Sequence, residues 1–174
     1  MSEIIIFGHK NPDTDAIGSA VAYSYLQNKL GFQTKAVALG EAGDETAYAL
    51  THFGLEHPEV VEKLENPGQP VMLVDHNEFQ QSIDGIEDAK ILSVVDHHRI
   101  ANFETSDPLN FRAEPLGSTC SIIYKLFKEN DVEIPQDIGG IMLSAIISDS
   151  LLFKSPTCTP ADEEIARDLA EIAQ

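Results

Sequence analysis

The sequence predicts an α/β fold in which a mainly parallel sheet has helices on both faces. Short apolar runs at residues 4–7, 71–74 and 91–95 have the length and the Ile and Val content of buried strands. Segments in which apolar residues recur at helical spacing lie between and after these runs. Strands that alternate with helices are typical of a parallel sheet that is covered on both sides.

The individual elements follow from start signals, stop signals and periodicity. An Asp-Thr-Asp run at 13–15 can cap a first helix that Gly31 ends, and Gly54 ends a second helix. Residues 136–148 are apolar almost all round, which predicts a buried helix, whereas 160–173 is amphipathic. The expected strands are 3–7, 34–39, 71–74, 91–95 and 111–114. The expected helices are 16–30, 45–53, 58–64, 79–83, 117–128, 136–148 and 160–173.

Length and composition narrow the class of protein. A chain of 174 residues can bury a sizeable core, so we expect residues 1–174 to form one domain. The formal net charge of −18 argues against a nucleic-acid surface, which would be basic. Two cysteines give no disulfide framework and suit a reducing cytosol. We see no signal peptide and no membrane span, so we expect a soluble cytoplasmic protein without a membrane partner.

Three of the predicted strands run directly into Asp and His residues. The first leads to His9, Asp13 and Asp15, the run 71–74 leads to Asp75, and the run 91–95 leads to residues 96–98, Asp-His-His. Ligands of parallel sheets bind beyond the carboxyl ends of the strands, so these side chains should meet. Burying them is costly unless they pair or bind a metal. The pattern therefore predicts one dinuclear metal site.

Each cluster by itself also has an ordinary structural interpretation. Asp13 or Asp15 can be a helix N-cap, His9 a satisfied core residue, and Asp75 a polar residue in a loop after a strand. Asp149 is a further candidate at the end of the helix 136–148. A carboxylate there meets the unfavourable end of the helix dipole unless a cation compensates. Only the combination of the four segments favours a metal site.

The residue types also indicate the chemistry. Adjacent imidazoles on an extended backbone point in different directions, so we expect at most one of His97 and His98 to be a ligand while the other faces a substrate. Nitrogen and oxygen ligands without a thiolate suit Mn²⁺, Co²⁺ or Mg²⁺ better than structural Zn²⁺. Two such ions that share a bridging carboxylate can activate a water and clamp a phosphoryl oxygen. Phosphoryl hydrolysis is therefore the expected reaction class.

The motifs resemble those of a known family. The chain is similar to the N-terminal catalytic domain of the family II, manganese-dependent inorganic pyrophosphatases, within the DHH phosphoesterase superfamily. The resemblance implies a Rossmann-like DHH domain, a homodimer, and hydrolysis of pyrophosphate to two phosphates by a hydroxide that bridges two Mn²⁺ ions. The runs that carry the resemblance are Gly8–Asp15, Val74–Glu78, Asp96–Arg99, Ser144–Ser150 and Leu151–Thr157.

The same resemblance implies a role for each motif residue. Asp75 would bridge the two ions, His98 would contact pyrophosphate and help protonate the leaving phosphate, and Asp96 would orient a histidine. The implied metal ligands are His9, Asp13 and Asp75 for one ion, and Asp15, Asp75, His97 and Asp149 for the other.

Members of that family continue into a C-terminal substrate-binding domain, which we expect to be absent from residues 1–174. Near the motifs only Lys10, Arg99 and Lys154 are cationic, although a phosphoryl-transfer site needs cations on the leaving group. The helix start at 117–119 could bind an anion or be an ordinary N-cap. We therefore expect the chain alone to bind two metal ions but to hydrolyse pyrophosphate weakly or not at all.

Two other functions fit the same ligands. A DHH phosphodiesterase that acts on short oligonucleotides or cyclic dinucleotides would need aromatic platforms and basic residues. A chain with no Trp, 7% aromatic residues and a strongly acidic balance offers few of either. A non-enzymatic metal-binding or dimerisation module would bind Mn²⁺ but would remain inactive even when joined to the C-terminal domain.

Overall fold

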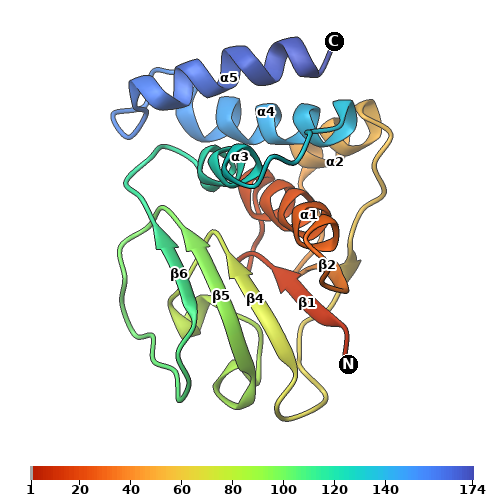
Figure 1. Cartoon of the computed structure of the whole chain (residues 1–174), viewed down its shortest axis with the longest axis vertical. Coiled ribbons are helices and arrows are strands. Elements are labelled where there is room, and N and C mark those ends of the chain that lie inside the picture. Colours follow the sequence, from red (N-terminus) through yellow and green to blue (C-terminus); the bar gives the residue numbers. More distant parts are fainter. Residues whose placement is uncertain (1) are drawn as a thin grey trace.

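The computed structural model describes residues 2–174, which form a six-stranded, all-parallel sheet and five α-helices (Figure 1). The α/β fold with a parallel sheet is as the sequence predicts. The strands are β1 (Ile4–Phe7), β2 (Thr34–Ala38), β3 (Glu59–Val60), β4 (Pro70–Val74), β5 (Lys90–Asp96) and β6 (Asn110–Ala113). The helices are α1 (Thr14–Lys29), α2 (Asp44–His52), α3 (Thr119–Glu129), α4 (Gln136–Ser150) and α5 (Pro160–Ile172), with two 3₁₀ turns, η1 (Phe79–Gln81) and η2 (Ile86–Asp88).

The strand order places a ligand crevice at one point of the sheet. The order is β3-β2-β1-β4-β5-β6, so the chain moves one way from β1 to β3 and the other way from β4 to β6. At such a switch point the connections after two neighbouring strands diverge and leave a crevice at their carboxyl ends. In this fold the switch point lies between β1 and β4, next to β5.

Alternating side chains of the strands divide the core into two apolar layers. Ile6 and Val74 point into the layer beneath α1 and α3, and the other α-helices pack behind or beside these two (Figure 1). Phe7 and Leu73 point into the opposite layer, which is closed by the 3₁₀ segment around Ile86 and by the loop that precedes β6. The α-helices therefore lie on one face of the sheet, and loops with two single 3₁₀ turns close the other.

The connection from β1 to α1 shows how the sequence sets the site. Asp13 is extended and caps α1, since its side chain accepts a hydrogen bond from the N–H of Ala16 at 2.9 Å. A Cβ at Gly8 would lie 2.7 Å from Ala16, so only glycine lets the end of β1 approach the helix this closely. Gly31, at φ +99°, ends α1 as expected.

One predicted element is wrong. The short helix expected over 58–64 is instead irregular chain that contains β3. Its backbone pairs in parallel with the edge of the sheet, where Val37 faces Glu59 and Ala38 faces Val60. Strand pairing at a sheet edge has overridden a weak local helix preference.

The other predicted strands and helices are present, with boundaries that shift by up to two residues. Within residues 2–174, none of the helices is both long enough and apolar enough to cross a membrane.

Candidate metal centre

Side chains from six segments of the chain meet at the switch point. They come from the loop after β1, the start of α1, the ends of β4 and β5, and the last turn of α4, while the start of α3 covers them from one side. The structure brings together all six residues that the sequence suggests as metal ligands. These residues are His9, Asp13, Asp15, Asp75, His97 and Asp149.

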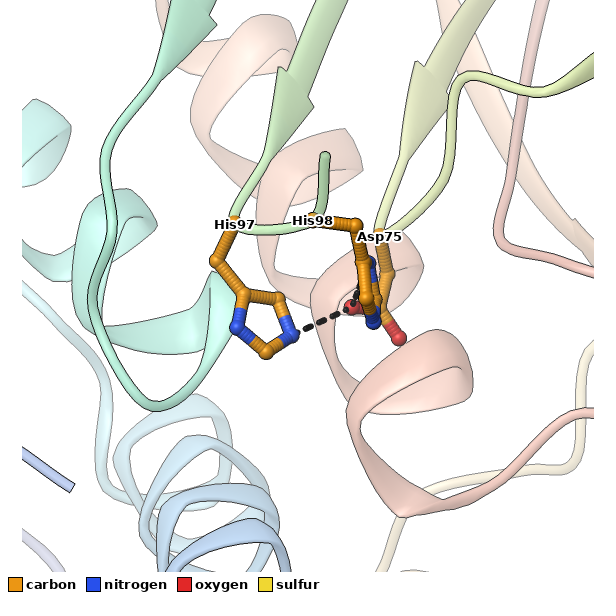
Figure 2. Close-up of side chains that lie close together, drawn as sticks. All are labelled: Asp75, His97 and His98. Atoms are coloured by element: carbon orange, nitrogen blue, oxygen red, sulfur yellow. Dashed lines mark ion pairs between the residues drawn. The ribbon is translucent and has the colours of Figure 1, made fainter. Parts of the chain in front are cut away.

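Asp75 lies at the middle of the cluster and is almost fully buried. Its Oδ2 is 3.3 Å from Nε2 of His9, whereas its Oδ1 is 3.3 Å from Nε2 of His97. Figure 2 shows His97 and His98 reaching from the end of β5 towards this carboxylate. The backbone of Asp75 is left-handed, with φ 60°, a conformation that Asp adopts more readily than most residues. The two oxygens of one carboxylate therefore face two different sets of groups.

The first set lies on the Oδ2 side of Asp75. Nε2 of His9 is 3.6 Å from Oδ1 of Asp13, in addition to its contact with Asp75. One ligand atom from each of the three residues lies within 4.8 Å of the others.

The second set lies on the Oδ1 side. Nε2 of His97 is 3.7 Å from Oδ2 of Asp15 and 3.9 Å from Oδ2 of Asp149. Ligand atoms of these three residues also lie within 4.8 Å of one another. Each side of the Asp75 carboxylate therefore presents a compact group of nitrogen and oxygen donors.

Backbone carbonyls orient both imidazoles. Nδ1 of His9 donates to the carbonyl of Lys10 at 2.7 Å, and Nδ1 of His97 donates to the carbonyl of Leu116 at 2.9 Å. Each Nε2 therefore faces carboxylate oxygens, an arrangement that needs a proton or a cation between nitrogen and oxygen. Metal-binding histidines usually show this arrangement, in which the nitrogen remote from the metal donates to a carbonyl or carboxylate.

The pKa values show how crowded the acidic groups are. Burial and the charge of Asp75 raise the pKa of Asp15 to about 7, and burial and the charge of Asp15 raise the pKa of Asp149 to about 11. Burial alone would raise the pKa of Asp75, but hydrogen bonds from His9 and His97 hold it well below its usual range. Divalent cations would relieve this repulsion among the carboxylates, so the donor set fits hard or borderline metal ions.

The two histidines also receive protons readily. Burial would lower the pKa of His9, but hydrogen bonds to Asp13 and Asp75 raise it to about 11. The pKa of His97 rises to about 9, since its contacts with Asp75 and Asp15 outweigh its burial. Protons thus occupy positions between nitrogen and oxygen that a metal ion could take instead.

His98 differs from His97 in what holds it. Its Nδ1 lies 2.8 Å from Oδ1 of Asp96, which also accepts the backbone N–H groups of His97 and His98. Asp96 is fully buried, and its other oxygen accepts a hydrogen bond from Asn77 at 2.7 Å. About half of the His98 side chain is exposed. The Asp-His-His run thus contains one buried orienting carboxylate and two imidazoles that both face Asp75, of which His98 is the more exposed and lies with Nδ1 3.8 Å from Oδ1 of Asp75.

Sequence reasoning assigns no ligand-orienting role to three further polar side chains near the site. Asn77 orients Asp96 and accepts the N–H of Ala101, while Ser118 and Thr119 at the start of α3 donate to Asp15 and Asp75. The Gly-Ser-Thr helix start is the only signal for the latter two. Ser118 does cap α3, and the anion at that helix start is the chain's own Asp15 carboxylate.

His76 follows Asp75 in sequence but does not join the cluster. Its two ring nitrogens are taken by the carbonyl of Val74 and the hydroxyl of Ser82, each at 2.9 Å. Burial lowers the pKa of His76 to about 4, so it stays neutral. It is a core histidine with a structural role.

Comparison with known proteins agrees with this geometry. Residues 3–146 match the model of the DHH family, N-terminal domain. The chain is 62% identical over its whole length to an Enterococcus faecalis protein named "Probable manganese-dependent inorganic pyrophosphatase", of which it covers 56%. A protein of the same name from an Exiguobacterium species is 61% identical, with 99% of this chain and 56% of the relative covered.

Solved structures show the same fold. The crystal structure of a Methanococcus jannaschii "putative family II inorganic pyrophosphatase" aligns with a TM-score of 0.88 and 40% identity, covering 97% of this chain and 55% of that one. An exopolyphosphatase-related protein from Bacteroides fragilis aligns with a TM-score of 0.74 at 15% identity, over 99% of this chain and 53% of that one, a likeness of fold alone. The chain thus spans about half the length of the relatives it matches.

Proposed function

Because this chain belongs to the DHH family, we propose that it carries the dinuclear manganese centre of an inorganic pyrophosphatase, which hydrolyses pyrophosphate to two phosphates. The observation that carries the proposal is the Asp75 carboxylate, whose two oxygens face two separate donor sets. A carboxylate shared in this way is the usual bridge of a two-metal phosphoryl-transfer site.

The proposed ligands divide between the two ions. Asp75 would contribute to both, and the chemistry that bound ions would supply is acidification of water and polarisation of phosphoryl oxygens. Mn²⁺ fits the nitrogen and oxygen donors, with Co²⁺ or Mg²⁺ as substitutes. His9, Asp13 and Asp75 would hold the first ion, and Asp15, Asp75, His97 and Asp149 would hold the second.

His98 is the proposed proton donor. Its hydrogen bond to Asp96 raises the pKa of His98, so the protonated form persists more readily at neutral pH. With Nδ1 committed to Asp96, the Nε2–H of the imidazolium is free to bind an oxygen of pyrophosphate and to protonate the leaving phosphate. Asp96 thereby orients His98 and favours its charged form.

The remaining cations of the reaction are proposed to come from a C-terminal domain outside this sequence. The relatives are almost twice as long, and two nearby cations are already engaged. Lys10 pairs with Asp84 at 2.8 Å, and Arg99 pairs with Glu78 at 3.3 Å. A pyrophosphate leaving group needs positive charge that these pairs do not offer freely. We expect weak hydrolysis, or none, by these 174 residues alone.

The location of the protein, its oligomeric state and its binding partners are also part of the proposal. We propose a cytoplasmic homodimer that binds pyrophosphate and no nucleic acid. The net charge of −18 and the two free cysteines, Cys120 and Cys158, support this setting.

Phosphate release from pyrophosphate in the presence of Mn²⁺ tests the function. The chain, its Asp75→Asn variant and the exposed-site control Asp88→Asn would be assayed alone and as part of a chain extended by the relatives' C-terminal half. Activity that Asp75→Asn abolishes and Asp88→Asn preserves would support the proposal. An extended chain that stays inactive on pyrophosphate, or that cleaves a short oligonucleotide instead, would refute it.

A further inference from the structure

The start of α3 contacts two of the proposed ligands from a third direction. The hydroxyl of Thr119 donates to Oδ1 of Asp75 at 2.9 Å. The hydroxyl of Ser118 donates to Oδ1 of Asp15 at 2.7 Å, and the backbone N–H groups of Thr119 and Cys120 donate to the same carboxylate at 2.8 and 3.1 Å. All of these groups are buried, so solvent cannot replace a lost donor.

The same turn orients a third proposed ligand. The carbonyl of Leu116 accepts the hydrogen bond from Nδ1 of His97 and so directs Nε2 towards the cluster. The segment 116–119 therefore contacts three of the four groups proposed for the second ion, and it touches Asp75 at the oxygen that faces His97.

In the part of the chain that the structure describes, no hydrogen bond joins that segment to His9, to Asp13 or to the Oδ2 atom of Asp75 that faces them. Among the described residues, His9 is oriented by the carbonyl of Lys10, and Asp13 by the N–H of Ala16, both of which are close neighbours in the chain. The two halves of the proposed centre thus differ in their support. One is held by contacts between close neighbours in the chain, the other by a turn that lies 19 residues from His97, 44 from Asp75 and 103 from Asp15.

The turn is anchored independently of the ligands. Asp162, fully buried at the start of α5, accepts hydrogen bonds from the backbone N–H groups of Gly117 and Thr159, each at 2.8 Å, and from the hydroxyl of Ser121. A Cβ at Gly117 would lie 2.9 Å from the Asp162 carboxylate, so glycine is needed there. The donors of the turn are therefore held in place by α5 before any ion binds.

We propose that Thr119 and Ser118 are positioning residues that set the affinity of the second metal ion and leave the first unaffected. The inference rests on the proposed dinuclear centre. Thr119 holds the plane of the Asp75 carboxylate so that Oδ1 points at the second donor set, and Ser118 holds Asp15 in the same way. Ser118 has the smaller effect, because Asp15 keeps two backbone donors without it.

Calorimetric titration of the metal-free chain with Mn²⁺ tests the proposal. The wild type should bind two ions. Thr119→Val keeps the shape of the side chain and removes its hydroxyl. It should lower the affinity for one ion by about 10- to 100-fold, the range seen for residues that orient metal ligands. Thr119→Ser restores the hydroxyl and should restore the affinity. Ser118→Ala should lower the affinity for the same ion by a smaller factor than Thr119→Val does.

Combining Thr119→Val with a second substitution, either His9→Ala or His97→Ala, identifies which of the two ions loses affinity. The effect of Thr119→Val should persist in a His9→Ala variant and should disappear in a His97→Ala variant. Thermal unfolding in EDTA reports folding separately, and Thr119→Val should leave it close to the wild type. The proposal fails if Thr119→Val binds both ions as tightly as the wild type does, or if it loses affinity for both ions equally. It also fails if Thr119→Val is unfolded in EDTA while Ser118→Ala binds both ions normally. A folded wild type that binds no Mn²⁺ refutes the dinuclear centre itself, and this inference with it.

Discussion

Without metal, the protein should lose stability as the pH rises from about 6.5 to about 9. In the folded protein the pKa of His97 is about 9 and those of His9 and Asp149 are about 11, all above their values in an unfolded chain. A raised pKa stabilises the fold below the unfolded value and loses that contribution as the pH climbs through the folded one. Asp75 has the opposite shift, so its contribution is lost only in acid.

The size of the effect follows from the protons involved. Each proton that the folded chain holds and the unfolded chain releases lowers the free energy of unfolding by about 1.4 kcal/mol per pH unit. Because Asp149, His97 and His9 share neighbours and compete for the same protons, we take one net proton. The loss across the window is then about 3 kcal/mol, which corresponds to a Tm lower by roughly 6–12 °C for a chain of this size.

Differential scanning calorimetry in EDTA at several pH values measures this slope. Asp149→Asn removes a carboxyl group whose pKa is raised, so the Tm of the variant should fall less steeply with pH and should be higher than that of the wild type at pH 9. Added Mn²⁺ should stabilise the wild type more at high pH than at low pH, because protons and metal compete for the same atoms. A wild-type Tm in EDTA that stays constant or rises across the window would show that the cluster does not hold extra protons.

Three further outcomes follow from the contacts of single residues. Asp96→Asn should lower the pKa of His98 in an NMR titration of the metal-free protein, because the hydrogen bond from Asp96 raises that pKa; an unchanged value would mean that Asp96 does not control His98. His76→Ala should lower the free energy of urea unfolding by about 1–3 kcal/mol and leave Mn²⁺ stoichiometry unchanged, since its two hydrogen bonds serve the core alone. Gly8→Ala should cost about 1–3 kcal/mol in the same urea assay, because its Cβ would meet Ala16 at 2.7 Å; a neutral result would show that β1 and α1 can separate freely.

Most of the fold could be predicted because its signals are local. Apolar runs gave the central strands, and caps such as Asp13 and stops such as Gly31 and Gly54 bounded the helices. The error at 58–64 arose where local pattern and tertiary pairing disagree. A two-residue strand at a sheet edge has too few residues to show a period, and its partner β2 lies about 20 residues away.

Only the donor side chains of the candidate site could be predicted. Asp75 and His97 stand at strand ends, and the rule for parallel sheets places strand ends together, so their meeting follows from sequence order and fold class. Thr119 follows no such rule. Its hydrogen bond to Asp75 depends on how α3 packs across the sheet, and a Ser-Thr pair at a helix start looks the same whether it caps the helix alone or also holds a ligand.

Several features that break local rules lie together at the edge where the donors meet. Asp75 takes a left-handed backbone conformation directly after a buried strand, and Asp149 places a carboxylate at the unfavourable end of α4. Asp15 is buried beside both of them, and Nε2 of His97 is directed at these oxygens by a backbone carbonyl. The left-handed backbone of Asp75 and the buried, crowded carboxylates of Asp15 and Asp149 disfavour the metal-free fold, and divalent cations would offset the charge crowding. A chain selected for stability alone would avoid this combination, so the concentration of strain and charge at one sheet edge is itself an argument that the edge was built to hold metal.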